Sequence, residues 1–200
     1  MTGRINAFCP HATKIHVDID PSNINKNVKV DLAIVGDAGF ALAAMLGAWR
    51  NDSHEPNGEA LADWWRQINT WREVDCLSYQ QDLSPTAVIK PQYAIERLYQ
   101  ATRAFEASTG RETYITTEVG QHQMWAAQYF RFDSPNHWMT SGGLGTMGYG
   151  LPAAQGVQVA HPDALVIDIA GEASILMNIQ EMGTLAQYRL PVKIFILNNQ

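Results

Sequence analysis

The sequence predicts an α/β protein whose larger part is a doubly wound parallel sheet, preceded by the tail of a second α/β domain. First, strand-like and helix-like segments alternate from residue 113 to residue 197. Second, the strand-like runs at 165–170 and 192–197 are almost continuously apolar, which is typical of parallel strands covered by helices on both faces. Third, a shorter strand, strand, helix order precedes them between residues 14 and 50.

Two strands, at 14–19 and 30–35, and an apolar helix over 40–49 are expected to end the first domain, which we assign to residues 1–50. The run of turn-forming residues that follows, 51–58, contains almost no apolar side chain and predicts the start of a linker.

The linker, assigned to residues 51–83, is expected to contain one helix. Its apolar residues recur at the spacing of one helical face. They are Leu61, Trp64, Trp65, Ile68 and Trp71. An aromatic stacking platform would use the same residues, but the regular spacing favours a helix that packs its indoles on the body of the protein.

Residues 84–200 are predicted to form the second domain, truncated at its C-terminus. Pro91 and Gly110 bracket its first helix, as helix boundaries prefer. The expected order is helix 91–107, strand 113–117, a helix to about 130, a glycine-rich loop over 141–150, a helix to about 160, strand 165–170, a helix from about 174 to 189, and strand 192–197.

Composition favours small-molecule chemistry. The 200 residues are 46% hydrophobic and carry a net charge of −6, so a core can form, whereas a nucleic-acid or membrane partner is not expected. No segment approaches the roughly 18 apolar residues of a membrane helix, and the N-terminal residues do not show the basic-then-apolar pattern of a signal peptide. We expect a cytoplasmic protein, or an organellar one in a eukaryote. Cys9 and Cys76 lie in no metal-binding pattern and are expected to be reduced, structural thiols.

Two polar side chains follow the last two predicted strands. Glu172 comes just after strand 165–170 and Asn199 just after strand 192–197, with one crossover helix between them. Such a connection normally brings two strand ends together, so the carboxylate and the amide oxygen could bind one hard cation. A helix beginning near Ser174 would direct its N–H groups at an anion held by that cation. Asp168, inside an apolar strand, lies either near this site or in a bond to the backbone.

The motifs around these residues resemble one family. Gly171-Glu172-Ala173 precedes Asn198-Asn199, with 27 positions between Glu172 and Asn199, and is similar to the thiamine-diphosphate motif. Four further segments, in the same order, resemble the catalytic (large) subunit of acetohydroxyacid synthase, also called acetolactate synthase. They are Glu-Val-Gly-Gln-His-Gln-Met-Trp at 118–125, Ser-Gly-Gly-Leu-Gly-Thr-Met-Gly at 141–148, Leu-Pro-Ala-Ala at 151–154 and Leu-Pro-Val-Lys at 190–193.

The resemblance runs from about Ile15 to Gln200 and implies that the chain is a C-terminal fragment with a thiamine-diphosphate-binding fold. It implies Mg²⁺ ligands at Glu172 and Asn199, with a third ligand, a backbone carbonyl, beyond Gln200. The residues implied to contact thiamine diphosphate are Gln121, His122, Gly145, Thr146, Met147, Glu172, Ala173, Ser174 and Asn199. Taken alone, His122 would more often be a structural histidine and Met147 a core residue.

The resemblance also implies an FAD site. Asp18 and Asp37 follow the first two predicted strands, where a carboxylate can accept hydrogen bonds from ribose hydroxyls. Without the resemblance, surface aspartates would be the better interpretation, and the loop glycines could simply form a tight turn. The implied FAD residues are Asp18, Ile19, Asp37, Ala38, Gly142 and Gly143.

The implied activity is the decarboxylation of pyruvate and its condensation with a second 2-keto acid, the first common step of valine, leucine and isoleucine synthesis. The resemblance further implies a homodimer or higher oligomer with the site at a subunit interface, and a small regulatory subunit. The family's catalytic glutamate lies in an N-terminal domain that this chain lacks, so no catalytic residue is expected here and the fragment alone should be inactive.

Two departures keep alternatives open. Glu172 stands where the wider superfamily has Asp, and Ala173 where it often has Gly. Mg²⁺ requires near-octahedral geometry, so the added methylene must be absorbed by the backbone or by side-chain rotation. A glyoxylate carboligase, a 2-keto-acid decarboxylase or a non-catalytic relative with a decayed metal site would also fit the pattern.

Overall fold

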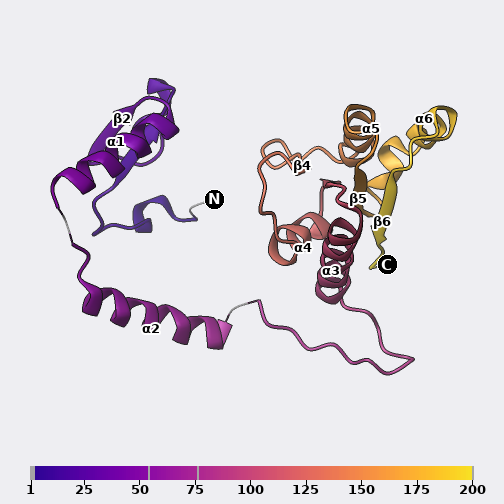
Figure 1. Cartoon of the computed structure of the whole chain (residues 1–200), viewed down its shortest axis with the longest axis horizontal. Coiled ribbons are helices and arrows are strands. Elements are labelled where there is room, and N and C mark those ends of the chain that lie inside the picture. The colour runs from indigo at the N-terminus through magenta and orange to yellow at the C-terminus, as the bar shows by residue number, and fades with distance from the viewer. Residues whose placement is uncertain (1–2, 54, 76, 200) are drawn as a thin grey trace. The chain divides into compact units, whose positions relative to one another are not determined.

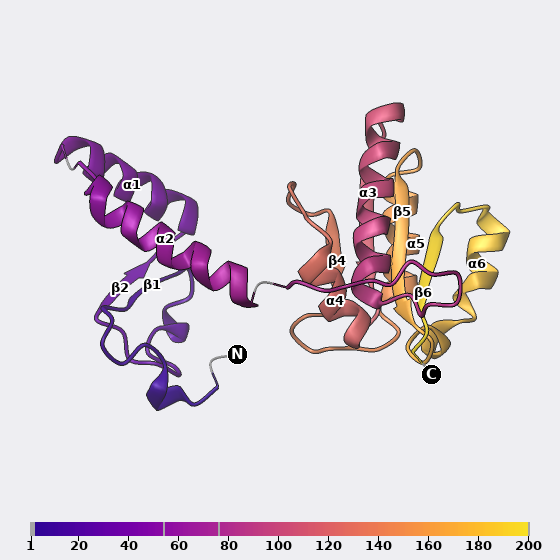
Figure 2. The same ribbon diagram turned by 90° about the horizontal axis from the view of Figure 1, so that it is seen from below.

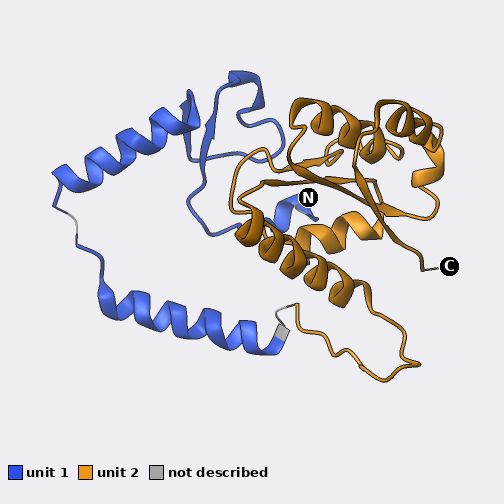
Figure 3. Ribbon diagram, turned by 45° about the vertical axis from the view of Figure 1, so that its right-hand side comes forward, with its two compact units in different colours: residues 1–74 blue, residues 75–200 orange. Residues whose placement is uncertain are grey.

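The computed structural model describes residues 3–53, 55–75 and 77–199, which fall into two units (Figure 3). The first unit is Met1–Val74 and the second is Asp75–Gln200. None of the described helices is long and apolar enough to cross a membrane.

The first unit contains a two-stranded parallel sheet followed by a helix, as predicted (Figure 1). Strand β1 (Ile15–Asp18) pairs with β2 (Leu32–Val35) so that Asp18 lies opposite Val35. Helix α1 spans Ala38–Asn51. Asp37 caps its N-terminus, because the Asp37 carboxylate accepts a hydrogen bond from the Phe40 N–H at 3.1 Å. Two short 3-10 helices, Ile5–Ala7 and Pro21–Asn23, complete the unit's irregular segments.

Helix α2 (Gly58–Asp75) confirms the helix predicted from the tryptophan spacing, but its indoles do not pack into a core. Trp64, Trp65 and Trp71 are 52–54% exposed in the described structure. Trp64 and Trp71 instead contact each other edge to face, with ring centroids 5.5 Å apart. The seven-residue spacing puts both on one face of the helix, so they can cover each other without a partner element.

The second unit is built on a four-stranded parallel sheet in the order β4-β3-β5-β6. Strands β3 (Thr113–Thr117), β5 (Leu165–Gly171) and β6 (Lys193–Leu197) confirm the three predicted strands. The edge strand β4 (Trp138–Thr140) was not predicted, because a three-residue strand is too short to show a periodicity. The chain runs from β3 outward to β4 and then returns past β3 to β5, so the direction of winding reverses between β3 and β5.

Helices cover both faces of this sheet (Figures 2 and 3). On one face Ile115, Ile167 and Ile169 pack with Ile95 of α3 (Pro91–Thr109) and with Ala126 and Phe130 in and just after α4 (Gln121–Tyr129). On the other face, alternate residues of the same strands pack against α5 (Gly150–Ala160) and α6 (Glu181–Tyr188). The two-residue alternation of a strand therefore divides the core into two layers.

Local sequence signals predicted one helix boundary correctly and another wrongly. Gly110 ends α3 in the left-handed region, with φ at 68°, as a glycine just past a helix was expected to do. The single helix predicted from about 174 to 189 is wrong. A 3-10 helix, Ile175–Asn178, is followed by α6, which begins only at Glu181. The break coincides with Asn178, whose side chain donates to the Gly148 carbonyl at 2.6 Å.

The prediction that the cysteines are structural thiols can be compared with the structure only at Cys9. Cys9 is a free thiol and is exposed, so it contributes to no core. Cys76 lies outside the described residues.

Candidate functional site

A cleft of about 320 Å³ opens at the carboxyl ends of β3, β5 and β6. Parallel α/β sheets bind ligands at this edge, next to the point where the winding reverses. The loops after β3 and β5 supply most of its lining, and Met147 enters from the glycine-rich loop. The lining residues are Val119, Gly120, Gln121, His122, Trp125, Met147, Gly171, Glu172, Ala173, Ser174, Leu197 and Asn199.

The cleft brings together Glu172 and Asn199, as the crossover connection predicted. Gly171 lies opposite Leu197 in the β5–β6 register, so both polar side chains stand just beyond neighbouring strand ends. Among the described residues, no group of three or more His, Cys, Asp or Glu side chains could hold a metal. A metal at this edge would therefore rest on one carboxylate and one amide oxygen from the side chains.

Ser174 is not at the start of an α-helix, contrary to expectation. It is buried. Its Oγ donates a hydrogen bond to the Gly171 carbonyl and accepts one from the Gly171 N–H, both at 3.2 Å. The hydroxyl thus closes a tight turn after β5, and only a one-turn 3-10 helix follows. A full helix dipole is absent at this point of the described chain, so an anion here would rely on loop N–H groups and side chains.

His122 is a buried polar residue of the cleft. It is 6% exposed, and its Nε2 has no hydrogen-bond partner among the described residues. Burial lowers the pKa of this imidazole. The ring fits between two glycines: a Cβ on Gly171 would lie 2.7 Å from Nδ1, and one on Gly120 would lie 2.8 Å from Cε1.

An unpaired buried nitrogen is costly unless a ligand completes its hydrogen bond. The glycines beside it have no room for side chains, because a Cβ at either position would overlap the ring. His122 therefore lines the cleft with a buried Nε2 whose hydrogen bond is not satisfied by the described residues.

The glycine-rich loop contributes less to the cleft than the resemblance implied. Of Gly145, Thr146 and Met147, only Met147 lines it. Gly145 turns the chain with φ at 73°, and the Thr146 N–H is bound by the Ser141 hydroxyl at 3.0 Å. Gly142 and Gly143 are exposed and line none of the described cavities.

Two buried acids behind the loop were not among the predicted site residues. Glu118 is fully buried and accepts hydrogen bonds from the Gly148 N–H at 2.6 Å and the Leu151 N–H at 3.0 Å. Asp168 accepts from the Thr116 hydroxyl at 2.9 Å, so its partner is a side chain and not the backbone. Burial raises the pKa of Asp168 to about 7, and the charge of Glu118 adds to the effect. Two signals were available for Glu118: it directly follows a buried strand, and it is the first residue of the 118–125 motif.

In the first unit, Asp18 and Asp37 stand at the carboxyl ends of the paired strands, as predicted. Asp18 accepts from the Asp20 N–H at 2.9 Å and from the Asn23 amide at 3.2 Å. The backbone bond from Asp20 lowers the pKa of Asp18. Both aspartates therefore hold local turns, Asp37 as a helix cap. Ile19 is 73% exposed and Ala38 is the first residue of α1.

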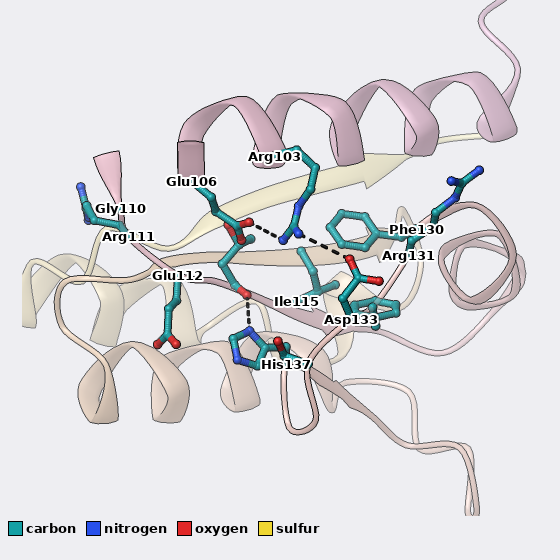
Figure 4. A pocket seen from close by; sticks show the side chains of 13 residues that line it. Arg103, Glu106, Gly110, Arg111, Glu112, Ile115, Phe130, Arg131, Asp133 and His137 are labelled. Carbon is teal, nitrogen blue, oxygen red and sulfur yellow. Dashed lines mark hydrogen bonds and ion pairs between the residues drawn. The ribbon is translucent and has the colours of Figure 1, made fainter. Parts of the chain in front are cut away.

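Another cavity of the second unit lies at the amino end of β3, opposite the cleft, and measures about 280 Å³ (Figure 4). Arg103 forms ion pairs there with Glu106 and, at 3.6 Å, with Asp133. His137 is bonded to the Thr113 carbonyl at 3.0 Å. Because these groups already satisfy one another and none belongs to a motif, the cleft at the carboxyl ends is the candidate site.

Comparison with known proteins agrees with this choice. Residues 118–200 match the family described as thiamine pyrophosphate enzyme, C-terminal TPP binding domain, and residues 1–45 match thiamine pyrophosphate enzyme, central domain. The acetolactate synthase isozyme 3 large subunit of Escherichia coli (strain K12) is 47% identical over 200 residues, which cover 100% of this chain and 33% of that protein.

Two further relatives give the same result. The acetolactate synthase large subunit of Haemophilus influenzae is 43% identical over 198 residues, covering 99% of this chain and 33% of the relative. That of Parasynechococcus marenigrum is 46% identical over 200 residues, covering 100% and 30%. The chain therefore spans about one third of the length of these curated relatives.

Proposed function

Because the chain belongs to the acetolactate synthase large-subunit family of thiamine pyrophosphate enzymes, we propose that it provides the cofactor-binding part of an acetolactate synthase. The complete enzyme decarboxylates pyruvate and joins the two-carbon unit to a second 2-keto acid, as the first common step of branched-chain amino-acid synthesis. One observation carries the proposal: a single cleft gathers Gln121, His122, Glu172 and Asn199 from three strand ends.

The residues of the cleft fit thiamine diphosphate held through Mg²⁺. Glu172 and the Asn199 side chain are hard oxygen donors of the kind that Mg²⁺ prefers. The unpaired Nε2 of His122 supports a polar ligand at the floor of the cleft, since a buried nitrogen needs a partner. Gln121, Ala173 and Ser174 line the same space and would contact the diphosphate.

When bound, thiamine diphosphate supplies the electron sink for decarboxylation and carbon–carbon bond formation. The role of the protein is to bind and orient this cofactor. Met147 lines the cleft with an apolar side chain, and Val119, Trp125 and Leu197 add apolar surface that would help to exclude water. His122, whose pKa is lowered by burial, stays neutral and can hydrogen-bond without adding charge. The catalytic glutamate of the family would come from outside this chain.

FAD forms a second part of the proposal. Asp18 and Asp37 follow parallel, adjacent strands, the arrangement in which strand-end carboxylates accept ribose hydroxyls. The neighbouring Ile19 and Ala38 would line the nucleotide. The match of residues 1–45 to the central domain of thiamine pyrophosphate enzymes supports this assignment at the level of the domain.

Assembly and location follow from the same family. Because the relatives are named large subunits, we include a small regulatory subunit among the partners, together with a homodimer or higher oligomer that completes the site at a subunit interface. We assign the enzyme to the cytoplasm, or to an organelle in a eukaryote.

Product analysis on the full-length protein tests the function. With Mg²⁺ and thiamine diphosphate, pyruvate alone should give acetolactate, and pyruvate with 2-ketobutyrate should also give acetohydroxybutyrate. Release of free aldehyde without condensation would identify a decarboxylase instead. Condensation with glyoxylate in place of pyruvate would identify a carboligase, and absence of cofactor binding would identify a non-catalytic relative.

A further inference from the structure

Glu118 is a buried carboxylate whose bonds all go to the glycine-rich loop and to the helix after it. One oxygen accepts from the Gly148 N–H at 2.6 Å and the other from the Leu151 N–H at 3.0 Å. Leu151 is the second residue of α5, where backbone N–H groups have no partner within the helix. An anion is favoured at such a helix start, because the unpaired N–H groups carry partial positive charge.

The peptide that Glu118 holds is the one that follows Met147. Its N–H belongs to Gly148, and the carbonyl of Gly148 accepts from the Asn178 side chain at 2.6 Å on the other side. Gly148 has φ at 86°, and a Cβ there would lie 2.9 Å from both Met177 and Asn178. Two side chains from distant segments therefore fix the backbone directly after Met147, which is the loop's one residue in the cleft.

Asp168 is a second buried acid beside the turn that Glu118 holds, and the two acids differ in their hydrogen bonds. A Cβ on Gly150 would lie 2.3 Å from its Oδ1 and 2.6 Å from the Glu118 nitrogen, so both acids abut the same turn of α5. Glu118 receives two N–H donors, whereas Asp168 receives one hydroxyl and leaves Oδ2 without a partner among the described residues. Both oxygens of Glu118 accept from N–H groups, as an ionised carboxylate does, whereas burial raises the pKa of Asp168 to about 7.

We propose that Glu118 is a positioning residue: as the anion of a buried acid pair with Asp168, it anchors the Met147–Gly148 peptide and so sets Met147 in the cofactor cleft. The part that concerns the cofactor rests on the proposed function. The anchoring itself concerns only this chain and can be measured without any ligand.

The test compares amide hydrogen exchange at Gly148 and Leu151 in the cofactor-free, full-length protein. Glu118→Gln keeps the shape but replaces one acceptor by an NH₂ group, so exchange at one or both amides should rise by about tenfold or more. At about pH 5, below the pKa of about 7 that burial gives Asp168, the wild-type carboxyl is protonated, so Asp168→Asn should leave both amides as in the wild type. Asp163→Asn, an exposed change of the same formal charge in the same unit, is the control.

A second readout is the ¹³C-methyl signal of Met147, which should shift and broaden in Glu118→Gln but not in the two Asn variants. If Glu118→Gln does not fold, Glu118→Asp keeps the charge with a shorter reach and should free at least one of the two amides. Exchange and Met147 signals equal to wild type in the folded Glu118 variant would overturn the proposal.

Cofactor titration then separates this proposal from the function. In the presence of Mg²⁺, Glu118→Gln should weaken thiamine-diphosphate binding by about tenfold, while Asp163→Asn should not. A freed loop with unchanged affinity would refute the role of Glu118 toward the cofactor. If the wild-type protein binds no thiamine diphosphate, the proposed function fails, whereas the exchange data still decide whether Glu118 anchors the loop.

Discussion

The side-chain amide of Asn199 donates a hydrogen bond to the side-chain oxygen Oε1 of Gln121 at 3.1 Å, across 78 positions of sequence. Gln121 follows β3 and Asn199 follows β6, two strands that are separated in the sheet by β5. The bond therefore connects the loops on either side of β5, the strand that Glu172 directly follows. The donor is the Asn199 side-chain nitrogen. The bond therefore does not use the side-chain oxygen of Asn199, which is the atom that would bind a cation.

The first prediction concerns Glu172. In the full-length protein, Glu172→Ala should weaken thiamine-diphosphate binding by about tenfold or more, equivalent to about 1.4 kcal/mol, because the diphosphate is held largely through the metal. Glu172→Asp keeps the charge and should retain much of the affinity with an altered Mg²⁺ dependence. Calorimetric titration at fixed Mg²⁺ measures both, with Asp163→Ala as the control. Wild-type affinity in Glu172→Ala would remove this residue from the ligand set.

The second prediction concerns the pH dependence of stability that Asp168 imposes. Its pKa is raised from 3.8 to about 7 in the folded protein, so the folded state holds the proton more tightly than the unfolded chain. Stability should therefore fall as pH rises from about 4 to about 7, by about 4 kcal/mol, and then level off. Asp168→Asn should remove this contribution, because the amide does not titrate.

Urea unfolding of wild type and Asp168→Asn at about pH 5 and about pH 8 measures the effect as a difference between the two proteins, which cancels the other titrating groups. Asp163→Asn, where the side chain is exposed, should show no such difference. A gap between wild type and Asp168→Asn that does not change with pH would contradict the assignment.

The third prediction uses two glycines of one helix. Gly150→Ala should destabilise the fold by about 1–3 kcal/mol, because the new Cβ would lie 2.3 Å from Asp168 Oδ1 and 2.6 Å from the Glu118 nitrogen. Gly156→Ala, in the same helix with nothing within 4 Å of its Cβ, should be neutral or stabilising by about 0.5–1 kcal/mol. Thermal unfolding of both variants checks the contrast, and equal midpoints would argue against close packing at Gly150.

The fourth prediction concerns flavin in the full-length enzyme. Asp18→Asn combined with Asp37→Ser should abolish bound FAD, seen as loss of visible absorbance after gel filtration, because both carboxylates that would hold ribose are gone. Serine at position 37 keeps an acceptor for the Phe40 N–H, so α1 retains its cap. Asp63→Asn, in an exposed ion pair of α2, is the control. Unchanged flavin content in the double variant would exclude this site.

Several features could be predicted from the sequence because their causes are local. The apolar run of β5, interrupted only by Asp168, and the glycine that ends α3 can both be recognised from residues adjacent in sequence. The nearness of Glu172 and Asn199 also followed, since a strand, crossover and parallel strand leave little choice of where the two ends lie.

The tertiary structure alone decided the rest, because the causes are contacts between distant residues. The break between Ile175–Asn178 and α6 coincides with the bond from Asn178 to Gly148, 30 positions earlier. β4 exists because its three residues find β3 to pair with. Glu118 and Asp168 become a buried acid pair only when α5 packs on β3 and β5. Burial and long-range hydrogen bonds determine the charge and position of these two carboxyl groups. Neither can be predicted from the residues that are adjacent in sequence.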